Sequence, residues 1–103
     1  MRIILSLFLL VFTSSLSRAD DIAAGRKLVE ANCSRCHAIG MEGGSPLAKA
    51  PPFREVVTRY PPDSLGEALV EGIVTGHNEM PEFVFTADQA SEIIAYLDSL
   101  VTK

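Results

Sequence analysis

The sequence predicts an all-α fold with three main helices and one shorter helical turn. Apolar residues recur at helical spacing in several segments, and capping residues stand before them. No stretch alternates apolar and polar residues for long enough to build a sheet, and no repeat or low-complexity tract is present. A chain of 103 residues with this pattern has room for one small domain only.

Residues 1–19 have the features of a secretory signal peptide. Arg2 provides the positive start, Ile3 to Phe12 form an apolar stretch with one serine, and Ser17-Arg18-Ala19 places small residues at the outer positions of a cleavage site. A membrane anchor is the alternative, but a spanning helix needs about 20 apolar residues and polar residues follow soon after Phe12. We therefore expect export to the periplasm and a mature domain at 20–103 without a membrane span.

The mature domain is acidic. Removal of residues 1–19 leaves 7 Lys and Arg against 13 Asp and Glu, a net charge of −6 with His neutral. Such a domain is poorly suited to bind nucleic acid. Its 84 residues provide a marginal core, so we expect a bound apolar group, around which the helices pack, to contribute to folding.

The first predicted helix begins at a cap provided by Asp20 or Asp21. Five residues fall at helical spacing on one side of it: Ile22, Gly25, Leu28, Val29 and Asn32. The helix leads directly to Cys33. The later segment 40–52 is rich in Gly and Pro and is therefore expected to be an irregular loop.

Two helical segments are expected in the middle of the chain. Residues 53–60 predict a short helix. The next helix is expected to begin at Pro61-Pro62-Asp63 and to end at Gly76. Its apolar face consists of Leu65, Leu69 and Ile73.

The last predicted helix spans residues 87–100. Thr86 with Gln89 three positions later is typical of a capping box, which satisfies free backbone N–H groups at a helix start. An apolar stripe follows, formed by Ile93, Ile94, Leu97, Leu100 and Val101. The stripe predicts a helix that packs one face against the core.

The most specific motif is Cys33-Ser34-Arg35-Cys36-His37, because the spacing C-x-x-C-H is typical of covalent c-type haem attachment. Two cysteine sulfurs can form thioethers with the two vinyl groups of one porphyrin, and the following histidine then faces the iron. The motif predicts Cys33 and Cys36 as attachment sites and His37 as the proximal ligand. A thiol redox pair, or a zinc or copper site that also uses His77, is the alternative. The adjacent histidine and the absence of a preceding strand favour haem.

Met80 is the candidate for the sixth iron ligand. It lies 43 residues after His37, in a stretch predicted to be non-helical, and the rigid Pro81 follows it. A thioether is a soft donor, and a His/Met pair closes the coordination sphere and raises the reduction potential. The alternatives are that Met80 only fills the core, or that His77 or Met41 binds the iron instead.

The haem motif, Pro46, Met80-Pro81 and the C-terminal amphipathic helix together resemble a small bacterial class I c-type cytochrome. The resemblance covers essentially all of residues 20–103. It implies one covalently attached haem c, with its iron, surrounded by the helices. It also implies that the carbonyl of Pro46 accepts a hydrogen bond from the second ring nitrogen of His37, which would fix the ring and raise its basicity. An ordinary loop proline is the alternative.

The resemblance further implies that Gly25 of the first helix packs against Tyr96 of the last, although a merely tolerated glycine is the alternative. The chain departs from the family in two ways. Leu28-Val29 stand where many relatives carry an aromatic residue, and no tryptophan is present to bind a haem propionate. Cationic or phenolic side chains that could replace it are Lys49, Arg54, Arg59 and Tyr60.

The sequence therefore predicts an electron carrier rather than an enzyme, with redox proteins as donor and acceptor. Its acidic excess favours a partner with a basic surface, because complementary charge raises the association rate. A haem subunit of a larger dehydrogenase or oxidase is the closest alternative. A ligand-binding or peroxidase-like cytochrome would require an open sixth position, which Met80 argues against.

Overall fold

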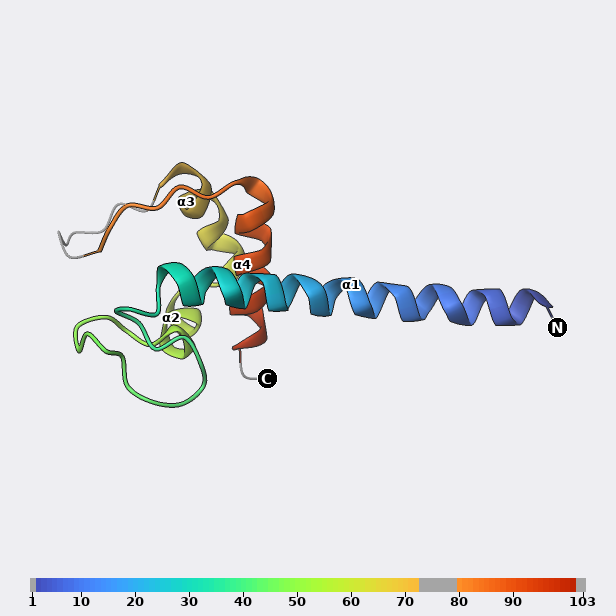
Figure 1. Cartoon of the computed structure of the whole chain (residues 1–103), viewed down its shortest axis with the longest axis horizontal. Helices are drawn as coiled ribbons and strands as arrows, with labels where there is room; N and C mark the ends of the chain where they lie inside the picture. Colours follow the sequence, from blue (N-terminus) through green and yellow to red (C-terminus); the bar gives the residue numbers. More distant parts are fainter. Residues whose placement is uncertain (1, 73–79, 102–103) are drawn as a thin grey trace.

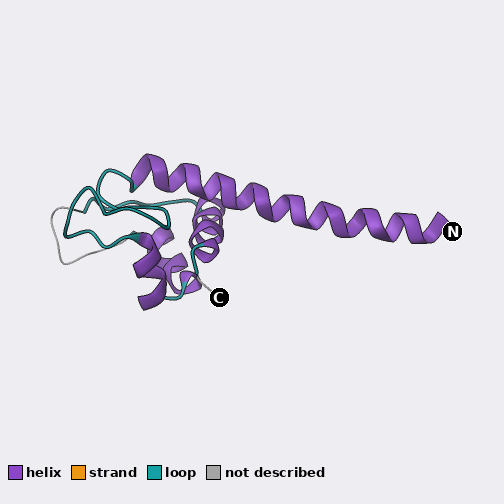
Figure 2. Cartoon of the chain, turned by 90° about the horizontal axis from the view of Figure 1, so that it is seen from below, coloured by secondary structure: helices purple, strands orange, loops and turns teal. Residues whose placement is uncertain are grey.

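The computed structural model describes residues 2–72 and 80–101, with side chains described from Ser17 onward. Over these ranges the chain contains helices and loops and no strand (Figures 1 and 2), which confirms the all-α prediction. The elements in chain order are α1 (Arg2–Asn32), α2 (Phe53–Arg59), the 3-10 helix η1 (Pro62–Leu65), α3 (Gly66–Glu71) and α4 (Ala87–Ser99). The short helix expected at 53–60 is thus present.

Helix α1 is longer than the sequence predicts. We expected a start at Asp20 or Asp21, but α1 begins at Arg2 and runs through both aspartates without a break. The physical reason is that residues 3–24 contain no Gly or Pro that would stop a helix. The N-terminal half of α1 projects beyond the other elements, and its C-terminal half lies against them (Figure 1).

The third helical segment ends earlier than predicted. It consists of η1 and α3, and the residue that stops it is Gly72, not Gly76, which lies outside the described residues together with Ile73. Gly72 has a φ of 108°, a backbone conformation that residues with a Cβ avoid. The predicted apolar face is present as far as the structure describes it, because Leu69 is buried and Leu65 packs against the core.

Helix α4 begins with the predicted capping box. The N–H of Gln89 donates to the Thr86 hydroxyl at 3.1 Å, and the Gln89 side chain accepts from the Thr86 N–H at 3.0 Å. The apolar stripe faces inward, with Ile93, Leu97 and Leu100 buried. The predicted end at Leu100 is one residue late, because Leu100 is the cap that follows Ser99.

The core lies where α1 crosses α4. Val29 of α1 is 1% exposed and is the most deeply buried large side chain of the described residues. At Gly25 the two helices approach so closely that an added Cβ would overlap the backbone carbonyl of Glu92 and lie 3.0 Å from Cβ of Tyr96. The expected contact between Gly25 and Tyr96 is therefore present, and it requires a glycine.

Replacement of Gly25 by Ala tests this crossing. In an unobstructed helix interior, Ala stabilises by about 1 kcal/mol relative to Gly. Here the added methyl must push α1 away from α4, so we expect Gly25→Ala to lower the free energy of unfolding by about 1–3 kcal/mol. Denaturant unfolding of the holoprotein measures this. Gly44→Ala is the control, because nothing lies within 4 Å of that position; a stabilised Gly25→Ala protein would contradict the close crossing.

Candidate functional site

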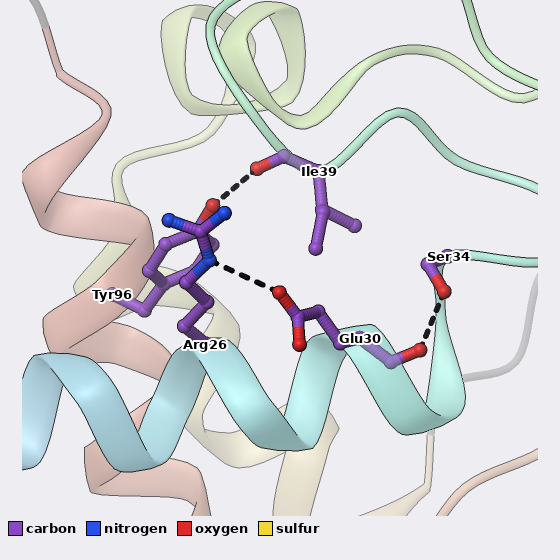
Figure 3. Close-up of polar contacts among 5 residues, drawn as sticks. All are labelled: Arg26, Glu30, Ser34, Ile39 and Tyr96. Carbon is purple, nitrogen blue, oxygen red and sulfur yellow. Dashed lines mark hydrogen bonds and ion pairs between the residues drawn. The ribbon is translucent and has the colours of Figure 1, made fainter.

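The Cys-x-x-Cys-His motif is wound as a helical turn directly after α1. The N–H of Cys33 donates to the carbonyl of Val29 at 2.8 Å, and the N–H of His37 donates to the carbonyl of Cys33 at 2.9 Å. The Ser34 hydroxyl donates to the carbonyl of Glu30, which ties the motif to the last turn of α1 (Figure 3). The buried part of α1 therefore fixes where both half-buried cysteines lie.

The imidazole of His37 is held from two directions. Its Nδ1 lies 2.7 Å from the carbonyl oxygen of Pro51, and its ring centroid lies 5.0 Å from that of Phe53, with the planes tilted by 38°. Because a carbonyl can only accept, Nδ1 carries the proton, so the neutral ring has its free lone pair on Nε2. An imidazole in this state is suited to bind a metal through Nε2.

The carbonyl that meets His37 is that of Pro51, and this corrects the assignment of Pro46. Pro46 is exposed, whereas Pro51 is half-buried and stands next to Pro52 and Phe53, the residue that packs on the ring. The N–H of Phe53 donates to the carbonyl of Ala38 at 2.9 Å, so residues 51–53 run beside the residue that follows His37. The nearer proline in sequence is therefore not the nearer one in space.

The predicted irregular loop, residues 40–52, closes back on the motif. The N–H of Leu47 donates to the carbonyl of Cys36 at 3.1 Å, and the Ser45 hydroxyl accepts from the N–H of Ala38 at 3.0 Å. These bonds satisfy one backbone group of the motif and one of the residue directly after it. Ser45, Pro51 and Phe53 are site residues that the sequence did not reveal, because only the path of the loop brings them to His37.

Tyr96 links α4 to the segment that follows His37. Its hydroxyl donates to the carbonyl of Ile39 at 2.5 Å, beside the ion pair between Arg26 and Glu30 (Figure 3). Burial raises the pKa of the Tyr96 hydroxyl above its ordinary value of 10.0; Arg26 acts in the opposite direction and Glu30 in the same direction. The phenol is therefore a neutral donor at physiological pH.

The second half of the site is the segment that begins at Met80. Met80 is half-buried, and the chain continues in irregular form to Phe85, whose N–H donates to the carbonyl of Leu69 at 2.9 Å. The rings of Phe83 and Phe85 stack at 6.0 Å. The segment 80–86 and the loop 40–52 lie at the same end of the molecule, away from the N-terminus (Figures 1 and 2). The segment that begins at Met80 and the loop that follows His37 thus lie at one end of the molecule.

The other candidate ligands are less well placed. Met41 is 49% exposed, and His77 lies outside the described residues. Over the ranges that the structure describes, no three His, Cys, Asp or Glu side chains gather closely enough to hold a metal ion. Burial, with a smaller contribution from Cys36, raises the pKa of the Cys33 thiol to about 11. Thiol redox proteins need a lowered pKa, so this raised value argues against them.

The donor set fits a c-type haem. Two thiols, an imidazole with one oriented nitrogen and a half-buried thioether are the groups that such a haem requires. Of the four candidate propionate partners, Arg54 is half-buried and its guanidinium reaches the carbonyl of Gly40 at 3.5 Å. Arg59 instead pairs with Glu55 on the surface at 3.8 Å. This helical fold and this donor set define the class of protein as a c-type cytochrome domain.

Comparison with known proteins identifies the family. The model of the family described as cytochrome C oxidase, cbb3-type, subunit III matches residues 20–97, and the chain belongs to this family. It is 32% identical over 88 residues to cytochrome c-552 of Bradyrhizobium diazoefficiens, covering 85% of this chain and 83% of the relative. It is 29% identical over 99 residues to cytochrome c6 of a Nostoc species, covering 90% and 82%. No solved structure matches the chain.

These matches confirm two predictions. The chain is a small bacterial class I c-type cytochrome by family and fold, and its function is electron transfer by a haem protein. Membership implies that the chain binds haem with its iron and has redox partners. In the part of the chain that the structure describes, no helix has the length and apolarity that crossing a membrane requires.

The hydrogen bond from Tyr96 to Ile39 can be tested by Tyr96→Phe, which removes only the hydroxyl. We expect the free energy of unfolding of the reduced holoprotein to fall by about 1 kcal/mol at neutral pH. The pKa of Tyr96 is raised in the folded state. The difference in free energy of unfolding between wild type and Tyr96→Phe is therefore fully present below pH 10.0, the ordinary pKa, and is lost as pH rises through the pKa of the folded state.

The control is Tyr60→Phe, because Tyr60 is 56% exposed. Unfolding is followed by circular dichroism between pH 7 and 11. If the advantage of wild type over Tyr96→Phe grew above pH 10.0 instead of shrinking, the neutral-donor assignment would be wrong.

Proposed function

We propose that this chain is an exported electron carrier that holds one haem through thioethers to Cys33 and Cys36, with His37 and Met80 as axial ligands. The observation that carries the proposal is the bond between His37 Nδ1 and the carbonyl of Pro51, because it places the proton on Nδ1 and leaves Nε2 of the neutral ring as the nitrogen that can bind a metal. A bound haem iron supplies a one-electron couple. The chain supplies the ligands, their orientation and an apolar surrounding.

Each residue has a separate task in this proposal. Cys33 and Cys36 fix the group relative to α1, so that it cannot dissociate. His37 is kept in one tautomer and one orientation by Pro51 and Phe53. Met80 would be the second protein ligand of the iron, which would keep small molecules from the metal and leave no open position for catalysis. The protein then moves electrons and is not itself an enzyme.

Export is the second part of the proposal. Residues 1–19 act as a signal peptide, and residues 20–103 are the periplasmic cytochrome domain. Residues 17–21 are exposed on α1, so a peptidase has access to the bond after Ala19. Cleavage there leaves Gly25, Val29 and the haem motif in the mature domain, and with them the crossing of α1 and α4.

The partners are redox proteins, and two arrangements are in question. A freely diffusing carrier is our first proposal. The description of the matched family as a subunit of a cbb3-type oxidase favours a second candidate, a haem-bearing subunit of a larger complex. Both use the same site and differ only in whether the domain stays bound to other subunits.

The ligand assignment predicts a particular visible spectrum. Protein from cells competent in cytochrome c maturation is expected to be low-spin in both oxidation states and not to react with carbon monoxide. The oxidised form should show the weak red absorption band that a bond between methionine sulfur and ferric iron produces, here called the sulfur–iron band. Met80→Ala is expected to remove this band and permit carbon monoxide binding, whereas Met41→Ala should retain wild-type behaviour. A high-spin wild-type spectrum would place the chain in the ligand-binding class instead.

Intact mass and native size test export, attachment and assembly together. The protein from the periplasm is expected to lack the mass of residues 1–19. It should also carry the added mass of one haem, which stays attached after denaturation. Cys33→Ala should weaken this covalent retention. Purification from the native host under mild conditions decides between the two arrangements: migration as a monomer supports the diffusing carrier, and stable co-migration with oxidase subunits supports the second candidate.

A further inference from the structure

The side chain of Tyr96 is a rigid hydrogen-bond donor. It is 5% exposed and belongs to the core cluster, and its Cβ lies at the point where α4 meets Gly25 of α1. From this buried position its hydroxyl donates to the carbonyl of Ile39 at 2.5 Å (Figure 3). Because the ring is enclosed, the hydroxyl cannot turn away without repacking of the core. A carbonyl two residues after His37 is thereby tied to the helix crossing.

The residues on both sides of Ile39 are bonded to the start of α2. The carbonyl of Ala38 accepts from the N–H of Phe53 at 2.9 Å. The carbonyl of Gly40 accepts from the guanidinium of Arg54 at 3.5 Å. Segment 38–40 and residues 53–54 therefore lie side by side, and the carbonyl of Ile39 between these two contacts is the one that Tyr96 holds.

The same start of α2 holds the imidazole of His37. The Phe53 ring packs on it at 5.0 Å between centroids, and the carbonyl of Pro51, two residues earlier, lies 2.7 Å from Nδ1. Both groups that orient the imidazole thus come from a stretch of three residues, 51–53, that is bonded to segment 38–40. The orientation of His37 depends in this way on where segment 38–40 lies.

We propose that Tyr96 is a positioning residue for His37: by holding the carbonyl of Ile39, its hydroxyl fixes segments 38–40 and 51–53 and with them the orientation of the imidazole. This inference rests on the proposed role of His37 as a haem ligand. It adds a residue on another helix that acts only through its hydroxyl, because a phenylalanine would fill the same space in the core.

Loss of the hydroxyl would leave the Ile39 carbonyl without this donor. A half-buried carbonyl in that state is stabilised by turning toward water. Gly40 permits the turn, since it has no Cβ and nothing lies within 4 Å of the place where one would be. Rotation of the peptide between Ile39 and Gly40 disturbs the neighbouring bonds to Phe53 and Arg54, so the segment that orients His37 loosens.

The test is Tyr96→Phe, and its main readout is solvent exchange of the Nδ1 proton of His37, followed by proton NMR of the reduced holoprotein. This proton is held by Pro51, so its exchange measures how often that bond opens. We expect exchange to become about fivefold faster, the factor to which loss of one net hydrogen bond corresponds.

The reduction potential is the second readout. The bond from Nδ1 to Pro51 makes the imidazole more basic, and a more basic ligand favours the oxidised iron. If the bond opens more often, that effect weakens. The potential of Tyr96→Phe is therefore expected to lie above that of wild type, and a potential equal to or below that of wild type would contradict the inference.

Thr86→Ala is the matched control for stability. Loss of the N-cap hydroxyl destabilises α4 by an amount comparable to loss of the Tyr96 hydroxyl. Thr86 bonds to Gln89 and not to segment 38–40, so exchange of the His37 proton and the potential are expected to stay at wild-type values. Tyr60→Phe, which removes an exposed hydroxyl, should also leave them unchanged. Equal acceleration in Thr86→Ala and Tyr96→Phe would overturn the inference, because the effect would then follow general stability.

The outcomes also separate this inference from the proposal on which it rests. If the wild-type protein shows no His37 proton signal displaced by a neighbouring haem, His37 is not the ligand and both fail. If wild type shows that signal and Tyr96→Phe exchanges it at the wild-type rate, the ligation stands and the positioning role of Tyr96 fails.

Discussion

The close crossing of α1 and α4 at Gly25 is the contact on which the rest of the structure depends. It brings the backbone of Glu92 against α1 where no side chain would fit, and it buries Val29 one turn further along. Since the Cys-x-x-Cys-His turn continues from α1 through hydrogen bonds to Val29, the same crossing places both cysteines. Tyr96, at the crossing on α4, then reaches forward to Ile39. One contact between helices thereby sets the position of the Cys-x-x-Cys-His motif.

The two halves of the site are built by different means. The His37 half is held by hydrogen bonds within a single stretch of chain, from the end of α1 to α2, in which Pro51 and Phe53 return to the ring. The Met80 half depends on α3, through the bond between Phe85 and Leu69 and the packing of Glu82 on Gly72. The His37 ring is therefore oriented by neighbours in sequence, with α4 bonding to Ile39 beside it, whereas the segment after Met80 is held by contacts with α3. The position of the segment after Met80 is thus the more sensitive to changes in packing between elements.

The features that local sequence determines were predictable, and those that depend on chain path were not. The capping box at Thr86 and the α4 stripe follow from residues three or four positions apart, and both are present. The partner of His37 was assigned to Pro46 and is Pro51, because the loop decides which carbonyl returns to the ring. The start of α1 was missed because acidic caps do not stop a helix that contains no Gly or Pro before position 25.

The electrostatic character of the core bears on the redox chemistry that this site can support. Among the residues with described side chains, none that is polar or charged is buried, and the buried set is apolar apart from the Tyr96 hydroxyl, which is hydrogen-bonded. Oxidation of a haem iron adds a positive charge to the centre, and an apolar surrounding without a nearby buried anion stabilises that charge poorly. A thioether ligand acts in the same direction, because it favours the reduced iron. Under the proposed His37/Met80 ligation, the core and Met80 would thus both raise the reduction potential, while the bond from His37 to Pro51 would increase ligand basicity and oppose them.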